Sequence, residues 1–112
     1  MTPDLLKGHL DLLLLSILES GPLHGYAIIE ELRRRSDGTF DLPEGTVYPA
    51  LHRLERLAYV SSHWSDETGR RRRQYQLNDG GRSALAKKAD EWREFSGAIE
   101  SVMRRTPCPT PA

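Results

Sequence analysis

The chain has 112 residues, with 16 Lys and Arg against 16 Asp and Glu, and one cysteine, Cys108. This length favours a single domain with its own core, and one thiol cannot form an internal bridge, which excludes a disulfide-stapled secreted scaffold. The longest apolar run, residues 12–15, is far shorter than the about 20 residues of a membrane span, and no basic leader opens the chain. We therefore expect a cytoplasmic protein without a membrane segment.

The balanced net charge conceals an uneven distribution along the chain. Residues 1–45 carry four basic and eight acidic side chains, whereas residues 46–82 carry seven basic and four acidic ones. Four of these basic side chains are consecutive, because residues 70–73 are all arginine. A local basic segment on a neutral protein indicates a polyanion that is bound by one face.

The first predicted helix has Thr2 as its N-cap and Pro3 at its first helical position, and it ends at Gly21-Pro22. Its leucines recur at spacings of three and four, but Leu12 and Leu15 make the segment apolar on nearly every side. We expect this helix to be buried against the core and against a second surface as well.

A second helix is predicted over residues 24–35, with His24 at its start and Tyr26 on its buried face. The sequence Ser36-Asp37-Gly38 ends it. The short segment at residues 40–42 is expected to pair as a minor strand.

The third predicted helix begins with Thr46 as its N-cap, which places Pro49 in the first turn, where a missing N–H costs little. One face is apolar and belongs to the core, with Val47, Leu51 and Leu54. The other face is aromatic, polar and basic, with Tyr48, His52, Arg53 and Arg56.

Two β-rich segments, residues 59–64 and 71–77, flank a turn-rich loop and predict a β-hairpin. Side chains alternate across a strand, so a pattern that turns Tyr75 inward leaves Arg70 and Arg72 facing outward.

The last predicted helix starts after Asn78 as N-cap and covers residues 79–105. Its apolar side chains follow a coiled-coil-like spacing over a length of about 40 Å, which exceeds what one small domain can cover. We expect a second copy of the chain to cover the excess. The interface is predicted to contain Leu6, Leu10, Leu13, Leu85, Trp92, Phe95, Ile99 and Val102.

The order of these elements is three helices, a hairpin with a basic loop, and a long helix. This order predicts a mainly α winged helix-turn-helix with a β-hairpin wing and a C-terminal dimerisation helix. The expected division is a DNA-binding domain over residues 1–78, the dimerisation helix over 79–105, and a disordered or polyproline II tail over 106–112.

The exposed side of the third helix and the hairpin arginines together suggest a nucleic-acid interface. Such a helix can place donors in the major groove, while arginines neutralise phosphates or enter the minor groove. The candidate DNA-binding residues are Thr46, Tyr48, Pro49, His52, Arg53, Arg56, Arg70 and Arg72. The alternative is a solvated hairpin edge whose arginines pair with Asp66 and Glu67.

Three segments carry a more specific pattern: LHGYAI at residues 23–28, LPEGTVYPALHRL at 42–54, and GRRRRQYQL at 69–77, followed by Gly81. Over about residues 5–85 the chain closely resembles the PadR family of bacterial transcriptional regulators. The resemblance implies a dimeric winged-helix repressor whose third helix enters the major groove and whose last helix dimerises with the first. Two departures are mild: Asn78 stands where threonine is commoner, and Val47 where leucine is.

The resemblance also implies a ligand site, because some small members of the family hold flat aromatic compounds between paired tryptophans at the dimer centre. Trp92 lies near the matching place, so a planar aromatic effector is one hypothesis, and a tryptophan packed in the dimer interface without a ligand is the other.

No enzyme activity, metal site or cofactor is expected from the remaining residues. The four histidines lack metal-ligand spacing, and no nucleophile or phosphate-loop motif is present. The function that competes with DNA reading is a winged-helix module whose basic hairpin binds an acidic protein.

Overall fold

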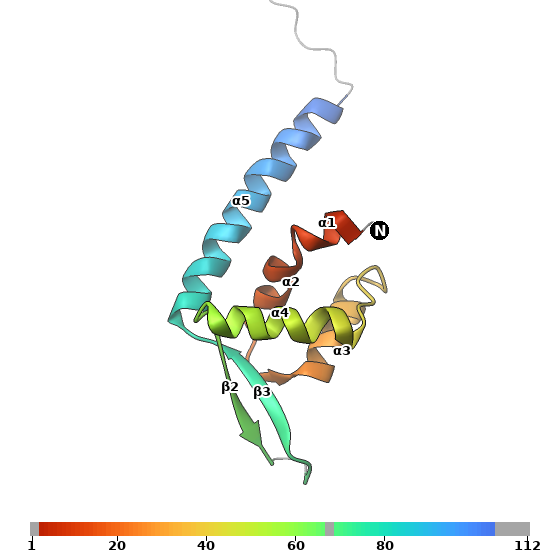
Figure 1. The fold of residues 1–112 in the computed structure, drawn as a ribbon. Helices are drawn as coiled ribbons and strands as arrows, with labels where there is room; N and C mark the ends of the chain where they lie inside the picture. Colours follow the sequence, from red (N-terminus) through yellow and green to blue (C-terminus); the bar gives the residue numbers. More distant parts are fainter. Residues whose placement is uncertain (1–2, 67–68, 105–112) are drawn as a thin grey trace, which may run out of the picture.

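A computed structural model describes residues 3–66 and 69–104 of the chain, and within them it contains five helices and three short strands (Figure 1). Their order is α1 (Pro3–Lys7), α2 (Leu10–Leu18), β1 (Leu23–His24), α3 (Gly25–Arg35), α4 (Glu44–Arg56), β2 (Val60–Ser65), β3 (Arg72–Leu77) and α5 (Asp79–Met103). The predicted Thr2 cap, the predicted helix end at Arg105 and the tail at 106–112 lie outside the described residues.

The sheet is antiparallel, with the strand order β1-β3-β2. β2 and β3 form the predicted hairpin, in a register that pairs Val60 with Leu77 and Ser65 with Arg72. This hairpin projects from the helical part as a wing (Figure 1). The winged-helix fold is thereby confirmed.

Residues 40–42 were predicted to form the minor strand, but the third strand of the sheet lies elsewhere in the chain. The backbone N–H of Phe40 donates to Ser36 Oγ at 2.8 Å, so this segment closes onto the end of α3 and does not join a sheet. The minor strand is β1, in which Leu23 pairs with Tyr75 of β3.

The prediction of one continuous first helix is also wrong, because the chain turns at Gly8 and His9. Glycine is about 1 kcal/mol less favourable than alanine inside a helix. The N–H of His9 bonds to the Leu6 carbonyl at 2.9 Å, which closes a turn between α1 and α2. The break lets α1 take a direction of its own (Figure 1).

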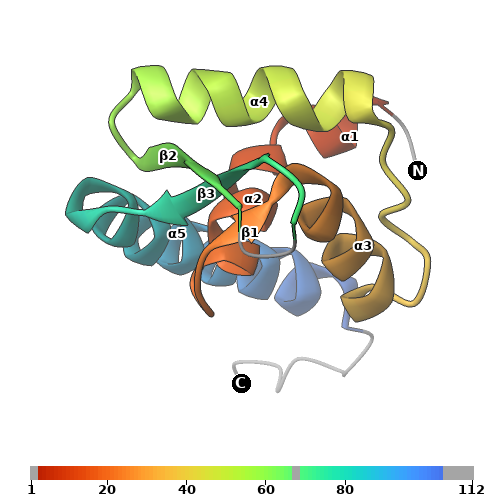
Figure 2. The ribbon, with the colours of Figure 1, turned by 90° about the horizontal axis from the view of Figure 1, so that it is seen from below.

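The core lies between α2, α3, α4 and the inner face of the sheet, as the view from below shows (Figure 2). Its most deeply buried side chains are Leu14, Leu15, Leu18, Ile28, Val47, Leu51, Leu54 and Tyr75. Tyr26 was predicted to be buried but is 59% exposed. It lies on the side of α3 away from Ile28 and Leu32, which face the core.

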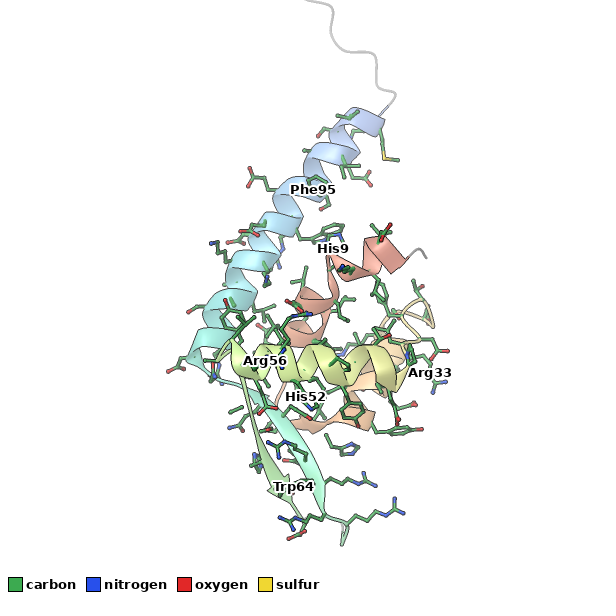
Figure 3. All side chains as sticks on the ribbon, viewed as in Figure 1. His9, Arg33, His52, Arg56, Trp64 and Phe95 are labelled. Atoms are coloured by element: carbon green, nitrogen blue, oxygen red, sulfur yellow. The ribbon has the colours of Figure 1, made fainter. Side chains whose placement is uncertain are left out.

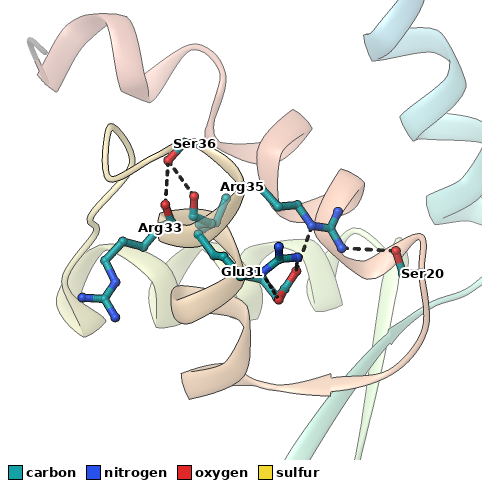
Figure 4. Close-up of polar contacts among 7 residues, drawn as sticks. Ser20, Glu31, Arg33, Arg35 and Ser36 are labelled. Atoms are coloured by element: carbon teal, nitrogen blue, oxygen red, sulfur yellow. Dashed lines mark hydrogen bonds and ion pairs between the residues drawn. The ribbon is translucent and has the colours of Figure 1, made fainter.

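Polar contacts fix the end of α3 (Figure 4). Glu31 accepts hydrogen bonds from Arg34 and Arg35, and these bonds lower the pKa of Glu31 to about 2. Arg35 also donates to Ser20 at 3.3 Å, which ties α3 to the turn after α2. Ser36 Oγ donates to the Leu32 carbonyl at 2.6 Å.

α5 begins as predicted, because the Asn78 side chain accepts a hydrogen bond from the N–H of Gly81 at 2.9 Å. A Cβ on Gly81 would lie 2.0 Å from the Tyr59 carbonyl oxygen, so only glycine fits this approach. Leu85 still joins the core, but from residue 90 onward the helix is largely exposed and runs away from the domain (Figure 1). None of the described helices has the length and apolar character to span a bilayer.

Candidate nucleic-acid interface

α4 starts at Glu44, two residues before Thr46, which was predicted to be its N-cap. Pro43 occupies the N-cap position, where it makes no side-chain cap, and the N–H of Thr46 bonds to the Pro43 carbonyl at 3.0 Å. Pro49 therefore lies in the second turn of the helix, where it removes the helical bond to the Gly45 carbonyl. Both Gly45 and Pro49 are exposed, so water can solvate this carbonyl.

The outer face of α4 carries Pro49, His52 and Arg56, all of which are exposed. His52 and Arg56 lie on the side of the helix away from the core (Figure 3). At 100° per residue, Tyr48 and Arg53 fall on the two flanks of this face. The structure brings the predicted side chains of α4 to one surface but turns Tyr48 and Arg53 in different directions.

Tyr48 packs against the start of α3. A Cβ built on Gly25 would lie 2.5 Å from the Tyr48 ring, so the absence of a side chain at Gly25 makes room for the ring. Partial burial, and then the charge of Glu44, raise the pKa of the Tyr48 hydroxyl. Tyr48 is thus a neutral donor at the edge of α4 nearest the wing.

A polar network joins α4 to the wing through Arg73. Ser62 Oγ donates to Glu55 Oε2 at 2.7 Å, and Arg73 Nε donates to Ser62 Oγ at 2.8 Å. The Arg73 guanidinium also lies 3.8 Å from the Glu55 carboxylate. These contacts hold the hairpin at a fixed position relative to α4.

Arg72 contacts His24, the N-cap residue of α3. Arg72 Nη1 lies 2.8 Å from His24 Nε2, while His24 Nδ1 faces the backbone N–H of Ala27 at 3.2 Å. Burial first, and the charge of Arg72 second, lower the pKa of His24 below its ordinary 6.5. A neutral imidazole can accept a hydrogen bond from one of these two donors, whereas a protonated ring can accept from neither, so the neutral ring is favoured.

The tip of the wing is organised around Trp64, which lies opposite Arg73 in the hairpin and is 54% exposed. The guanidinium carbons of Arg71 and Arg73 lie 4.8 Å and 5.5 Å from the centre of the Trp64 ring system. Figure 3 shows Trp64 near the end of the hairpin. Stacking of this kind restrains arginine side chains before any ligand binds.

Exposure of the arginines depends on distance from the tip more than on the face of the strand. Arg70 and Arg71 are exposed, whereas Arg72 and Arg73 are half-buried. Arg70 is exposed as predicted, whereas Arg72 is only half-exposed, because its guanidinium also contacts His24.

A hollow of about 440 Å³ lies between the wing and the start of α3 and α4. It is lined by His24, Gly25, Tyr26, Tyr48, Trp64 and the arginines at 70–73. His24, Tyr26 and Trp64 belong to this surface although they were not predicted as members of it. The hairpin register was a usable signal for Trp64, since pairing residue 60 with 77 places it opposite Arg73.

A second surface lies on α5, where Trp92, Phe95, Ile99 and Val102 are exposed. Two other residues predicted for the dimer interface, Leu10 and Leu85, are buried in the protomer core. We therefore assign Leu10 and Leu85 to that core. Leu6 and Leu13 are half-buried against it.

Trp92 meets His9 from the turn between α1 and α2, with ring centroids 4.9 Å apart in an edge-on arrangement. Hollows of about 240 and 280 Å³ lie beside this pair. The first is lined mainly by polar side chains, including Asp11, Lys88 and Glu91. The second is lined mainly by apolar ones, including Leu5, Leu13 and Phe40.

The helical core, the basic wing and the exposed face of α4 together define a winged-helix transcriptional regulator. The family model for the transcriptional regulator PadR-like family matches residues 14–87. The chain belongs to this family, and its members and structural neighbours are regulators of transcription, so it is not an enzyme.

Solved structures and a curated relative agree with this assignment. A transcriptional regulator from Clostridium thermocellum, Cth-833, is 31% identical with a TM-score of 0.82, over 90% of this chain and 99% of that one. A PadR family transcription regulator from Clostridium difficile R20291 is 35% identical with a TM-score of 0.75, over 86% and 99%. The transcriptional regulator Rv3488 of Mycobacterium tuberculosis is 38% identical over 63 residues, 56% of each chain.

Proposed function

We propose that the chain is a homodimeric repressor that binds an inverted-repeat operator in double-stranded DNA. One observation carries the proposal: the exposed face of α4 and the arginine-rich wing lie on the same surface, and Arg73, Ser62 and Glu55 connect them. A surface of this form can read base edges with a helix while the wing contacts phosphates or the minor groove.

In this proposal α4 enters the major groove with its outer face. Thr46, Tyr48, His52 and Arg56 supply donors, and Pro49 supplies an apolar contact. At the wing, Arg70 and Arg72 neutralise phosphates at the flank of each half-site. The two α4 helices of a dimer then bind half-sites that lie about one helical turn apart.

The second copy is supported by the exposed apolar side chains of α5. Residues 79–105 act as the dimerisation helix and residues 1–78 as the DNA-binding domain in this proposal. Packing Trp92, Phe95, Ile99 and Val102 against a partner removes from water apolar surface that one chain leaves exposed. A contiguous patch of this kind is a mark of a protein interface.

We also propose that a planar aromatic effector binds beside Trp92 and releases the DNA. The edge-on contact of His9 with Trp92 and the two adjoining hollows support this hypothesis. A ligand that prefers one angle between the protomers changes the spacing of the two α4 helices, and hence the affinity for the operator.

DNA reading is tested by titrating the native protein with a duplex from its own upstream region and with a scrambled duplex of equal composition, at several salt concentrations. We expect tighter binding to the upstream duplex, and affinity for both that falls as salt rises. Equal affinity for the two duplexes contradicts the repressor. Capture of an acidic protein without binding to either duplex favours the winged-helix protein-interaction module instead.

The effector site is tested by the fluorescence of Trp92. Planar aromatic compounds should quench the native emission, and Trp92→Phe should abolish this response while Trp64→Phe leaves it. Quenching that is lost only with Trp64→Phe places the compounds at the wing and contradicts the site on α5.

A further inference from the structure

Arg53 is a predicted DNA contact on α4 that forms an ion pair with another helix. Its guanidinium forms an ion pair with the carboxylate of Asp11 on α2, a residue 42 positions earlier in the chain. The Asp11 side chain is only 24% exposed and that of Arg53 is 46% exposed. Partial burial limits the screening of this pair by salt, which makes it more persistent than a pair in open water.

Asp11 also faces a second place in the molecule. It lines the hollow of about 240 Å³ that contains His9 and Trp92. The same turn of α2 therefore forms a wall of this hollow and holds the Arg53 flank of α4. Figure 3 shows His9 beside α5, at the end of α2 that lies away from α4.

We propose that Asp11 is a positioning residue that holds Arg53 off the DNA and couples the DNA-reading helix to the hollow beside Trp92. The inference rests on the proposed DNA binding of α4. Phosphates compete with the Asp11 carboxylate for the same guanidinium, so Arg53 has two alternative partners. When Arg53 moves to a phosphate, the Asp11 carboxylate in the wall of the hollow loses its counter-charge.

This arrangement couples the affinity for DNA to the state of the hollow beside Trp92, and the coupling acts in both directions. A change at the hollow that draws Asp11 away from Arg53 frees a cation for DNA, and a change that strengthens the pair withholds it. Thermodynamic linkage requires that DNA binding alter the hollow to the same extent.

The first arm of the test measures binding to a short random-sequence duplex, for which no operator is needed. Asp11→Asn should raise the affinity and steepen its salt dependence by about one phosphate contact per protomer. A fourfold reduction in salt then widens the affinity ratio of variant to native protein by about threefold per protomer. Asp11→Glu keeps the carboxylate, so this variant should have the affinity and salt dependence of the native protein.

Arg53→Gln is the matched background that separates the pair from a general loss of negative charge. In this background Asp11→Asn should change neither affinity nor salt dependence. An equal gain in both backgrounds, or no gain in the native one, overturns the inference. If the native protein does not prefer its upstream duplex, the proposed binding to an operator is contradicted. The comparison of variants on the random duplex can still be interpreted in that case.

The second arm measures acrylamide quenching of Trp92 in Trp64→Phe protein, where Trp92 is the only tryptophan. Adding the random duplex should change the quenching, and adding Asp11→Asn should remove that change, because the pair is then already broken. A DNA-dependent change that persists with Asp11→Asn, or no change in either protein, overturns the coupling to the hollow.

Discussion

Two surfaces of this chain differ in how their side chains are held. On the α4 and wing surface, Arg73 contacts Ser62, Arg72 contacts His24, and Arg71 stacks on Trp64. On α5 beyond residue 89, large apolar side chains project into solvent from a helix that runs away from the domain (Figure 1). The first surface is organised by contacts within one chain, whereas the second leaves its large apolar side chains exposed.

This difference matters for binding energetics. Ordering one long side chain at an interface costs about 0.5–1.5 kcal/mol, and restraints made before binding reduce that cost. The wing has such restraints already. The α5 surface depends instead on burial of apolar area, worth about 25 cal/mol per Å². A charged side chain introduced on the apolar face of α5 should therefore weaken the proposed dimer more than a single substitution in the wing weakens DNA binding.

The largest expected effect is that of Ile99→Glu on the α5 surface. Dimerisation would bury two symmetric carboxylates among apolar side chains, so we expect the dimer to weaken by about 100-fold or more. Size-exclusion chromatography with light scattering should show a monomer. Ser101→Glu, on the opposite side of the same helix, is the matched control and should remain dimeric. A dimer that persists with Ile99→Glu places the interface elsewhere.

Gly81→Ala tests the joint at which α5 leaves the domain. The new Cβ would lie 2.0 Å from the backbone carbonyl oxygen of Tyr59, so the start of α5 must move away from the hairpin. We expect the free energy of unfolding to fall by about 3 kcal/mol in a urea titration, the upper range for overpacking.

Gly97→Ala is the matched control for that joint, because within residues 3–66 and 69–104 no atom outside its own helical surroundings lies within 4 Å of the added Cβ. It should stabilise the protein by up to about 1 kcal/mol through helix propensity. Equal destabilisation by both substitutions would show that the close approach of Gly81 to Tyr59 is not what fixes α5.

Arg70→Ala combined with Arg72→Ala tests the basic surface. Losing both should weaken binding to operator and random duplexes alike, by about tenfold at moderate salt, and should flatten the salt dependence by about two phosphate contacts per protomer. In contrast, Tyr48→Ala should change the preference between related operator sequences. If the two sets of variants act identically on all duplexes, the division between wing and α4 is wrong.

The restraint on Arg72 predicts a dependence of stability on pH. The folded state lowers the pKa of His24, so the unfolded state binds more protons once the pH falls below about 6.5, and stability is lost as the pH drops through that value. His24→Asn keeps an N-cap acceptor for Ala27 but cannot titrate. The difference in melting temperature between native and variant proteins should therefore change between pH 7.5 and 5.5. A constant difference contradicts a lowered pKa at His24.

Local sequence patterns predicted much of this molecule and missed what depends on distant partners. The hairpin and the Asn78 cap follow from strand alternation and capping chemistry within a few residues, and both are confirmed. The pair of Asp11 with Arg53 and the contact of His24 with Arg72 join residues 42 and 48 positions apart. No spacing rule along the chain identifies these partners, because only the packing of α2 against α4 and of the start of α3 against the wing brings them together.

Errors in predicting individual elements have the same origin. Residues 40–42 have a strand-like composition, but the N–H of Phe40 donates a hydrogen bond to Ser36 Oγ. The strand at this edge of the sheet is β1, which pairs with β3. Likewise, residue spacing placed Arg53 at the edge of the exposed face of α4, but it did not identify the ion pair with Asp11 of α2.

The smallest expected effect concerns the backbone between α4 and the wing. Ala58 has a φ of 61°, a left-handed conformation that costs an L-residue about 1–2 kcal/mol. The N–H of Tyr59 bonds to the Leu54 carbonyl and that of Ala58 to the Glu55 carbonyl, both at 3.0 Å, which is the helix-ending motif that normally uses glycine. Ala58→Gly should therefore raise the free energy of unfolding by about 1 kcal/mol in a urea titration. Because these bonds and the network of Arg73 both set the angle of the wing, DNA affinity should be unchanged. Stabilisation accompanied by weaker DNA binding would show that the side chain of Ala58 contributes to the wing surface.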